Sequence, residues 1–104
     1  MEMDKGLRIL GLGYRSRGVQ IGSVNIEQKI KKRQGFLLLL AADCGDSTQR
    51  KLIDLCEKNK IPWQKWGSRE EFSRIFPRET VAVLILDANI AKPFLNGKGR
   101  VLND

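Results

Sequence analysis

Apolar positions near the start of the chain change their spacing, which indicates a helix followed by a strand. Leu7, Leu10 and Tyr14 recur at helical spacing and predict a first helix that ends near Gly18. Val19 and Ile21 then alternate with polar neighbours, as in a short half-buried strand. The chain therefore opens as a helix-strand unit.

A second helix is predicted directly after this strand. Gly22–Ser23 is typical of a turn with an N-cap, and Ile26 and Ile30 supply a buried stripe. The helix is expected to run to about Gln34, where Gly35 stops it.

Two unbroken apolar runs predict strands that are covered on both faces. They are "FLLLLAA" at residues 36–42 and "TVAVLILD" at residues 80–87. Between them, "WQKW" at residues 63–66 follows Pro62, which is compatible with a strand only at a sheet edge or at the strand's first residue. Helices are thus expected on both sides of one sheet.

Two further helices carry start signals of the capping-box type. Asp46 and Gln49 fit a D-x-x-Q box, and Ser68 and Glu71 fit an S-x-x-E box for a helix that Pro77 ends. The side chains expected to be buried are Leu52, Leu55 and Cys56 in the earlier helix and Phe72, Ile75 and Phe76 in the later one.

A short last helix over residues 88–95 completes an alternation of helices and strands. This order predicts an α/β fold, a three-layer α/β/α sandwich with a four-stranded mixed sheet. We expect a single domain at residues 1–95 and a flexible C-terminal tail at residues 96–104, "NGKGRVLND".

Composition narrows the chemistry. The chain has no histidine, which removes the commonest general base and the Ser-His and Cys-His nucleophile pairs. Cys44 and Cys56 form no C-x-x-C pair, so neither a zinc site nor a disulfide framework is indicated. Any catalysis would therefore have to rest on carboxylates or lysines, and we expect no metal and no cofactor.

Charge points to an anionic partner. The net charge is +7, and residues 1–35 hold eight basic and three acidic residues, a net +5. Such an excess is most often associated with nucleic acid.

No signal peptide is apparent, and the longest apolar run is far shorter than the roughly 20 residues that span a bilayer, so we expect a cytoplasmic protein without a membrane partner.

The glycines of "GLGYRSRGVQIG" invite comparison with a nucleotide-binding loop. Ser16 stands at the third glycine position of that fingerprint, and no long amphipathic helix starts after Gly13. Asp43 follows the loop by about thirty residues where the motif places its ribose-binding acid at about twenty. We therefore interpret the glycines as sites of close packing between the first helix and the sheet, with Gly18 as its C-terminal stop.

Several segments of the sequence, taken together, resemble a known protein family. "LGLGYRSRGVQIG", "LLLLAADCGDSTQRKLIDLCEKNKIPW" and "GSREEF" followed by "VAVLILD" are similar to the ribosomal protein L-seven-Ae/L-thirty-e family, especially its small bacterial members of the YlxQ type. The resemblance covers roughly residues 5–95. It implies an α/β/α sandwich without catalysis and, as in the best-understood members, binding of kink-turn RNA.

Those members carry G-[ST]-N-E-x-x-K at the start of the second helix, where Asn, Glu and Lys read sheared G·A pairs. If Ile30 keeps the family's buried position, Gly22 and Ser23 match, while Val24, Asn25 and Gln28 replace the Asn, Glu and Lys. A slip of one residue would place Asn25 and Lys29 on the Asn and Lys but Ile26 on the Glu. We prefer the first register because the buried phase of a helix is harder to shift than its exposed residues.

The resemblance and the charges together suggest a surface for structured RNA, ribosomal or otherwise linked to translation. A polar stripe at i, i+3, i+4 and i+7 and the amides of a helix N-terminus suit phosphate contacts. A second family contact loop corresponds to "FPRET". The candidate RNA-binding residues are Gly22, Ser23, Asn25, Gln28, Lys29, Lys32, Arg33 and Arg78.

Other interpretations of the same residues stay open. The stripe is also compatible with an ordinary solvated helix face, and the altered triad is compatible with a protein-interaction adaptor that has lost RNA recognition. Trp63 and Trp66 could stack on bases, but we interpret them as core or sheet-edge residues. The sequence does not indicate the oligomeric state.

Overall fold

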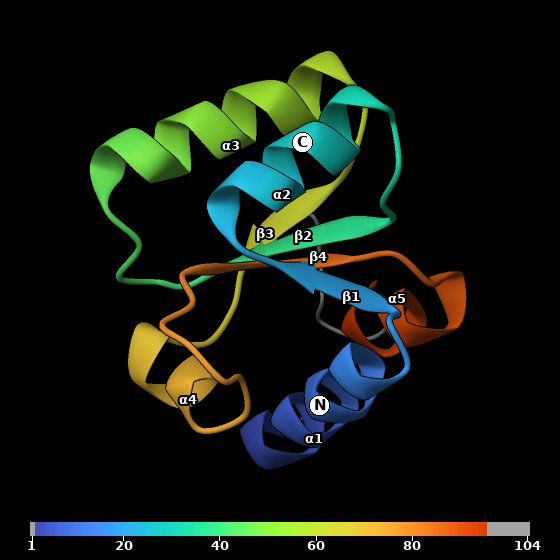
Figure 1. Cartoon of the computed structure of the whole chain (residues 1–104), viewed down its shortest axis with the longest axis vertical. Coiled ribbons are helices and arrows are strands. Elements are labelled where there is room, and N and C mark those ends of the chain that lie inside the picture. Colours follow the sequence, from blue (N-terminus) through green and yellow to red (C-terminus); the bar gives the residue numbers. More distant parts are fainter. Residues whose placement is uncertain (1, 96–104) are drawn as a thin grey trace.

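A computed structural model describes residues 2–95, in which helices and strands alternate along the chain (Figure 1). The C-terminal tail expected at residues 96–104 lies outside the described residues. The elements are α1 (Met3–Arg15), β1 (Val19–Ile21), α2 (Ser23–Lys31), β2 (Leu37–Leu40), α3 (Asp46–Lys58), β3 (Trp63–Lys65), α4 (Arg69–Ser73), β4 (Ala82–Ile85) and α5 (Ala88–Leu95).

The four strands form one mixed sheet in the order β1-β4-β2-β3. β4 pairs antiparallel with both β1 and β2, and β3 pairs parallel with β2. Leu38 in β2 lies opposite Leu84 of β4 on one side and Trp63 of β3 on the other. β3 is an edge strand and directly follows Pro62, so the position predicted for "WQKW" is confirmed.

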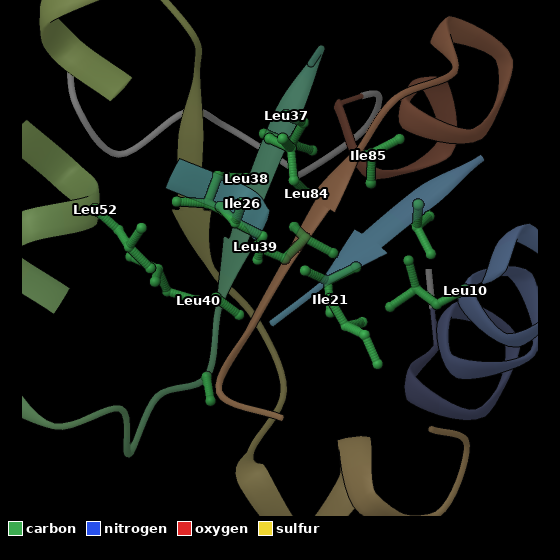
Figure 2. Close-up of a cluster of buried hydrophobic side chains, with 14 of the residues drawn as sticks. Leu10, Ile21, Ile26, Leu37, Leu38, Leu39, Leu40, Leu52, Leu84 and Ile85 are labelled. Carbon is green, nitrogen blue, oxygen red and sulfur yellow. The ribbon is translucent and has the colours of Figure 1, made fainter. Parts of the chain in front are cut away.

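Helices cover both faces of this sheet. In Figure 1, α2 and α3 lie on one face, and α1, α4 and α5 lie on the other. Every residue of β2 and β4 is buried, as the unbroken apolar runs predicted. Figure 2 shows Leu52 of α3 and Leu10 of α1 approaching the sheet from opposite sides, and both are fully buried. The predicted α/β/α sandwich with a four-stranded mixed sheet is confirmed.

The end of α1 differs from the prediction. The helix ends at Arg15, and Arg17 rather than Gly18 adopts the left-handed conformation, with φ 65°. The Gly18 amide donates to the Gly13 carbonyl at 2.6 Å, which is the long bond of a Schellman motif. Gly18 is instead a site of close approach, because a Cβ there would lie 2.4 Å from Cδ1 of Ile90.

The end of α2 is built in the same way. The helix ends at Lys31, about three residues before the predicted end. Arg33 has φ 58°, and the Gln34 amide donates to the Lys29 carbonyl at 2.9 Å. The stop therefore lies at Arg33, and Gly35, with φ 130°, belongs to the connection into β2.

The two predicted capping boxes have different outcomes. Gly45 is the N-cap of α3 and Asp46 is its first residue, without a side-chain cap bond, so that box is wrong. Ser68 caps α4 as predicted, because its Oγ accepts the Glu71 amide hydrogen at 3.1 Å. α4 ends already at Ser73, before the proline expected to end it.

Gly11 and Gly13 lie inside α1, which excludes a phosphate-cradling loop at that position. Gly13 is a close-packing site as predicted, since a Cβ would lie 3.1 Å from Val19 Cγ1 and 3.1 Å from Ile90 Cδ1. Gly11 is not, because its nearest neighbour would be Ile75 Cβ at 3.8 Å, an ordinary contact. None of the helices within residues 2–95 combines the length and apolar character needed to cross a membrane.

Candidate nucleic-acid interface

β1 leads into α2 through Gly22, whose backbone requires glycine. Its φ of 91° lies in a region that residues with a Cβ rarely adopt. Ser23 is the first helical residue and not the cap expected from the sequence. The amides of Ser23, Val24 and Asn25, in the first turn, have no intrahelical acceptor and point out of the helix start. Within the described residues no side chain caps α2, so these amides are left unpaired.

Arg78 lies at the start of α2, although it is distant in sequence. A Cβ on Gly22 would lie 3.5 Å from Arg78 Nη2 and 3.5 Å from Asn25 Nδ2, so both side chains border the same piece of backbone. In Figure 1, the connection from α4 to β4 passes beside the point where β1 enters α2. The structure thus brings together two segments that the sequence analysis selected separately.

The outward face of α2 carries the predicted stripe. Asn25, Gln28 and Lys32 are exposed, and Lys29 is half-buried on the same side of the helix. Arg33 is exposed directly after the helix. These residues extend from the N-terminus of α2 to its C-terminal end, over about 10 Å at 1.5 Å per residue.

The buried face of α2 supports the first of the two alignments. Ile26 and Ile30 are both fully buried. In the slipped alignment, Ile26 would stand where the family has a base-reading Glu, which needs access to RNA. The alignment that keeps Ile30 buried puts Val24, 67% exposed, at the family's Asn position.

The only acidic residue of α2 does not reduce the positive charge of this face. Glu27 lies on the flank of the helix near α3, where its Oε2 is 3.3 Å from Nζ of Lys51. On a helical wheel, Glu27 and Lys29 occupy opposite flanks of the buried stripe. The stripe therefore contains amides and cations without a carboxylate.

The acidic neighbour of Arg78 is likewise occupied elsewhere. Glu79 forms an ion pair with Arg69, and the hydrogen bond from Arg69 to this carboxylate raises the pKa of the Arg69 guanidinium. Among the described residues, no carboxylate lies within ion-pair distance of Arg78. Its guanidinium is exposed beside the free amides of α2.

The positive charge of the first third of the chain is divided between two faces. Arg8 and Arg15 of α1 line a hollow of about 340 Å³ together with Arg74, on the layer opposite α2. Of the eight basic residues within residues 1–35, those of α2 and its C-terminal connection lie at the candidate interface, whereas Arg8 and Arg15 lie in the opposite layer.

The two tryptophans lie in the core and at the sheet edge, as the sequence analysis expected. Trp66 is half-buried against Phe72 and Phe94, with ring centroids 6.2 Å and 5.2 Å away, and Trp63 is half-buried at the sheet edge. The exposed aromatic residue is Phe36, at 49%. Its place in "FLLLLAA" predicts burial, and only the glycine before it signals that the strand has not yet begun.

These features define an α/β/α sandwich with an uncapped, outwardly basic helix at one corner. The model of the ribosomal protein L7Ae/L30e/S12e/Gadd45 family matches residues 5–94. The chain belongs to this family, which confirms the resemblance inferred from its sequence phrases.

Individual relatives agree. The chain is 30% identical over 89 residues to the RNA-binding protein YlxQ of Bacillus subtilis, with 85% of this chain and 89% of that protein covered. A Bacillus halodurans protein of unknown function has a similar structure, with a TM-score of 0.79, 29% identity and coverage of 88% and 93%. A Giardia lamblia 15.5kD RNA binding protein shares the fold at a TM-score of 0.71 and 18% identity, with 86% of this chain and 80% of that one covered.

Proposed function

We propose that the chain is a non-catalytic protein that binds structured RNA through the corner formed by α2 and the α4–β4 connection. The observation that carries the proposal is the convergence of Arg78, Asn25 and the unpaired first-turn amides around Gly22. Helix N-termini bind phosphates because their amides and dipole both favour negative charge. Family membership and the RNA-binding relative in Bacillus subtilis support RNA as the partner.

The stripe would then follow the RNA backbone away from this corner. The proposed contacts to the RNA backbone come from the amides of Ser23, Val24 and Asn25 beside Gly22, from Lys29, Lys32 and Arg33, and from Arg78. The side chains of Asn25 and Gln28 supply hydrogen-bonding groups between them. Phosphate contacts position RNA without specifying its sequence. Because Val24, Asn25 and Gln28 replace the family's base-reading residues, selectivity for kink-turn RNA is a separate part of the proposal and needs its own test. The RNA partner that we propose is a ribosomal or other translation-linked RNA in the cytoplasm.

A titration of two RNAs tests the proposal. A kink-turn RNA and a plain hairpin of equal length are titrated with the protein at several salt concentrations. Lys29→Glu combined with Lys32→Glu should weaken binding and reduce the slope of log K against log salt by about 1.4 to 1.8, because each lost phosphate contact contributes about 0.7 to 0.9. Tight binding of the kink-turn alone would establish selective recognition.

A matched variant separates the surface from the net charge. Lys5→Glu combined with Lys92→Glu makes the same change of charge on α1 and α5, in the layer opposite α2, where both lysines are exposed. This control should keep the wild-type slope. Equal losses in both double variants would contradict the assignment to α2, and failure of the wild type to bind either RNA would favour the adaptor function instead. Urea unfolding of each variant checks that Lys29, which is half-buried, is not needed for folding.

A further inference from the structure

A second hollow lies at the other end of α2, where the chain turns into the sheet. It has a volume of about 380 Å³ and is lined by Arg33, Gln34, Gly35, Phe36 and Leu86. Phe36 is 49% exposed, and every other aromatic side chain in the described part of the chain is buried or half-buried. The residues that line the hollow carry a guanidinium, a carboxamide and an aromatic ring, and none of them carries a carboxylate.

The backbone fixes this hollow without help from a ligand. The Arg33 amide donates to the Ile30 carbonyl at 2.8 Å, in the motif that ends α2, and the Phe36 amide donates to the Ile85 carbonyl of β4 at 2.8 Å. Between them, Gly35 sits so close to Leu84 that a Cβ would lie 2.8 Å from its Cδ1. Phe36 is thus held between the end of a helix and the central part of the sheet.

We propose that this hollow binds an unpaired nucleobase of the same RNA, stacked on the ring of Phe36. The inference rests on the proposed function, because it continues the α2 stripe by one position beyond Lys32. Unpaired bases stack on aromatic side chains, and carboxamides pair with base edges. Gln34 supplies that amide, and Arg33 supplies a cation for the adjoining phosphate.

Charge favours this occupant over an apolar protein segment. A nucleotide presents a flat apolar ring and an anionic phosphate a few ångströms apart, which matches Phe36 beside Arg33. The hollow is also adjacent to Lys32, at the end of a surface already suited to phosphate. A protein partner that bound here instead would leave RNA binding insensitive to Phe36.

The first experiment compares Phe36→Leu with Phe36→Trp on the structured RNA that the wild type binds, extended by a single-stranded tail. Phe36→Leu should lower affinity about tenfold, within the 5- to 150-fold range that corresponds to loss of one stacked base, whereas Phe36→Trp should retain it. The slope of log K against log salt should stay unchanged in Phe36→Leu, because the ring is uncharged. Leu12→Ala, which removes exposed apolar surface on α1, is the control and should bind like the wild type.

The second experiment changes the RNA instead of the protein. Abasic sites introduced one at a time along the tail should reveal a position where the loss equals that of Phe36→Leu, with no further loss when both are combined. Equal affinity of Phe36→Leu and wild type, or additive losses at every abasic position, would overturn the inference while leaving RNA binding through α2 intact. Absence of RNA binding by the wild type would overturn both.

Discussion

Gly6 of α1 gives a quantitative test of the packing between the N-terminal helix and the sheet edge. A Cβ at Gly6 would lie 2.3 Å from Cζ2 and 2.7 Å from Cη2 of Trp66. The Trp66 ring is stacked on Phe72 at an interplanar angle of 25° and meets Phe94 edge-on at 87°. Because the ring is held from two sides, the added methyl group of Gly6→Ala cannot be accommodated by a simple side-chain rotation.

The magnitude follows from two opposing effects. Carbon atoms in favourable contact are about 3.5 to 4.0 Å apart, so the methyl group and the ring would have to separate by more than about 1 Å. Overpacking of this kind costs about 1 to 3 kcal/mol of unfolding free energy. Alanine is better than glycine inside a helix by about 0.8 to 1 kcal/mol, which offsets part of that cost. The net change for Gly6→Ala is a loss of up to about 2 kcal/mol.

Gly11→Ala in the same helix isolates the clash. A Cβ at Gly11 would make only an ordinary contact, at 3.8 Å from Ile75 Cβ, so this variant should gain up to about 1 kcal/mol from helix propensity alone. The difference between the two variants therefore equals the overpacking cost, about 1 to 3 kcal/mol, or at least about 4 °C in melting temperature for a chain of this size. Urea unfolding followed by far-ultraviolet circular dichroism measures both. Equal stability of Gly6→Ala and Gly11→Ala would refute the packing argument.

Two further predictions concern a helix end and a buried thiol. Lys60, after α3, has φ 59°, a left-handed conformation that glycine adopts without strain. Lys60→Gly should therefore raise the free energy of unfolding by about 0.5 kcal/mol in thermal or urea unfolding, because the strain relieved exceeds the entropic cost of glycine. An equal gain in Lys60→Ala would contradict this origin. Burial, followed by the charge of Glu57, raises the pKa of Cys56 from 9.0 to about 12. As the pH rises, the thiol ionises in the unfolded protein before it ionises in the folded one. The free energy of unfolding should therefore keep its full Cys56 contribution below pH 9 and decline between pH 9 and 12, less steeply in Cys56→Ala. Identical urea-unfolding profiles of the two proteins over this range would contradict the prediction.

The layered fold was accessible from sequence because its strongest signals are local and redundant. The runs in β2 and β4 contain no polar residue, and a strand without polar positions needs cover on both faces. Ser68 and Glu71 were readable as a cap because the two residues satisfy each other within one turn. Pro62 placed β3 at an edge because it cannot donate a hydrogen bond to a ladder.

The helix ends were less accessible because they depend on tertiary space. Glycine is the usual left-handed residue after a helix, yet here Arg17, Arg33 and Lys60 occupy those positions. The neighbouring Gly18 and Gly35 are needed for another reason, since a Cβ on either would come within 3 Å of a core side chain. A sequence shows that a glycine is present near a helix end, but not which of two adjacent constraints requires it.

The candidate site divides in the same way. The members of the α2 stripe follow from helical periodicity, whereas the approach of Arg78 to Gly22 follows from the pairing of β1 with β4. Phe36 is exposed just before β2, where its amide donates to the Ile85 carbonyl of β4. In the alignment that keeps Ile30 buried, Gly22 and Ile30 match the backbone part of the expected family motif, and Val24, Asn25 and Gln28 stand at its base-reading positions. The fold fixes the former, because a positive φ and a buried stripe tolerate few alternatives, but places no constraint on exposed side chains such as Val24. For the RNA binding proposed above, selectivity could therefore change without any change in the helix that presents these residues, so affinity and selectivity require separate measurements.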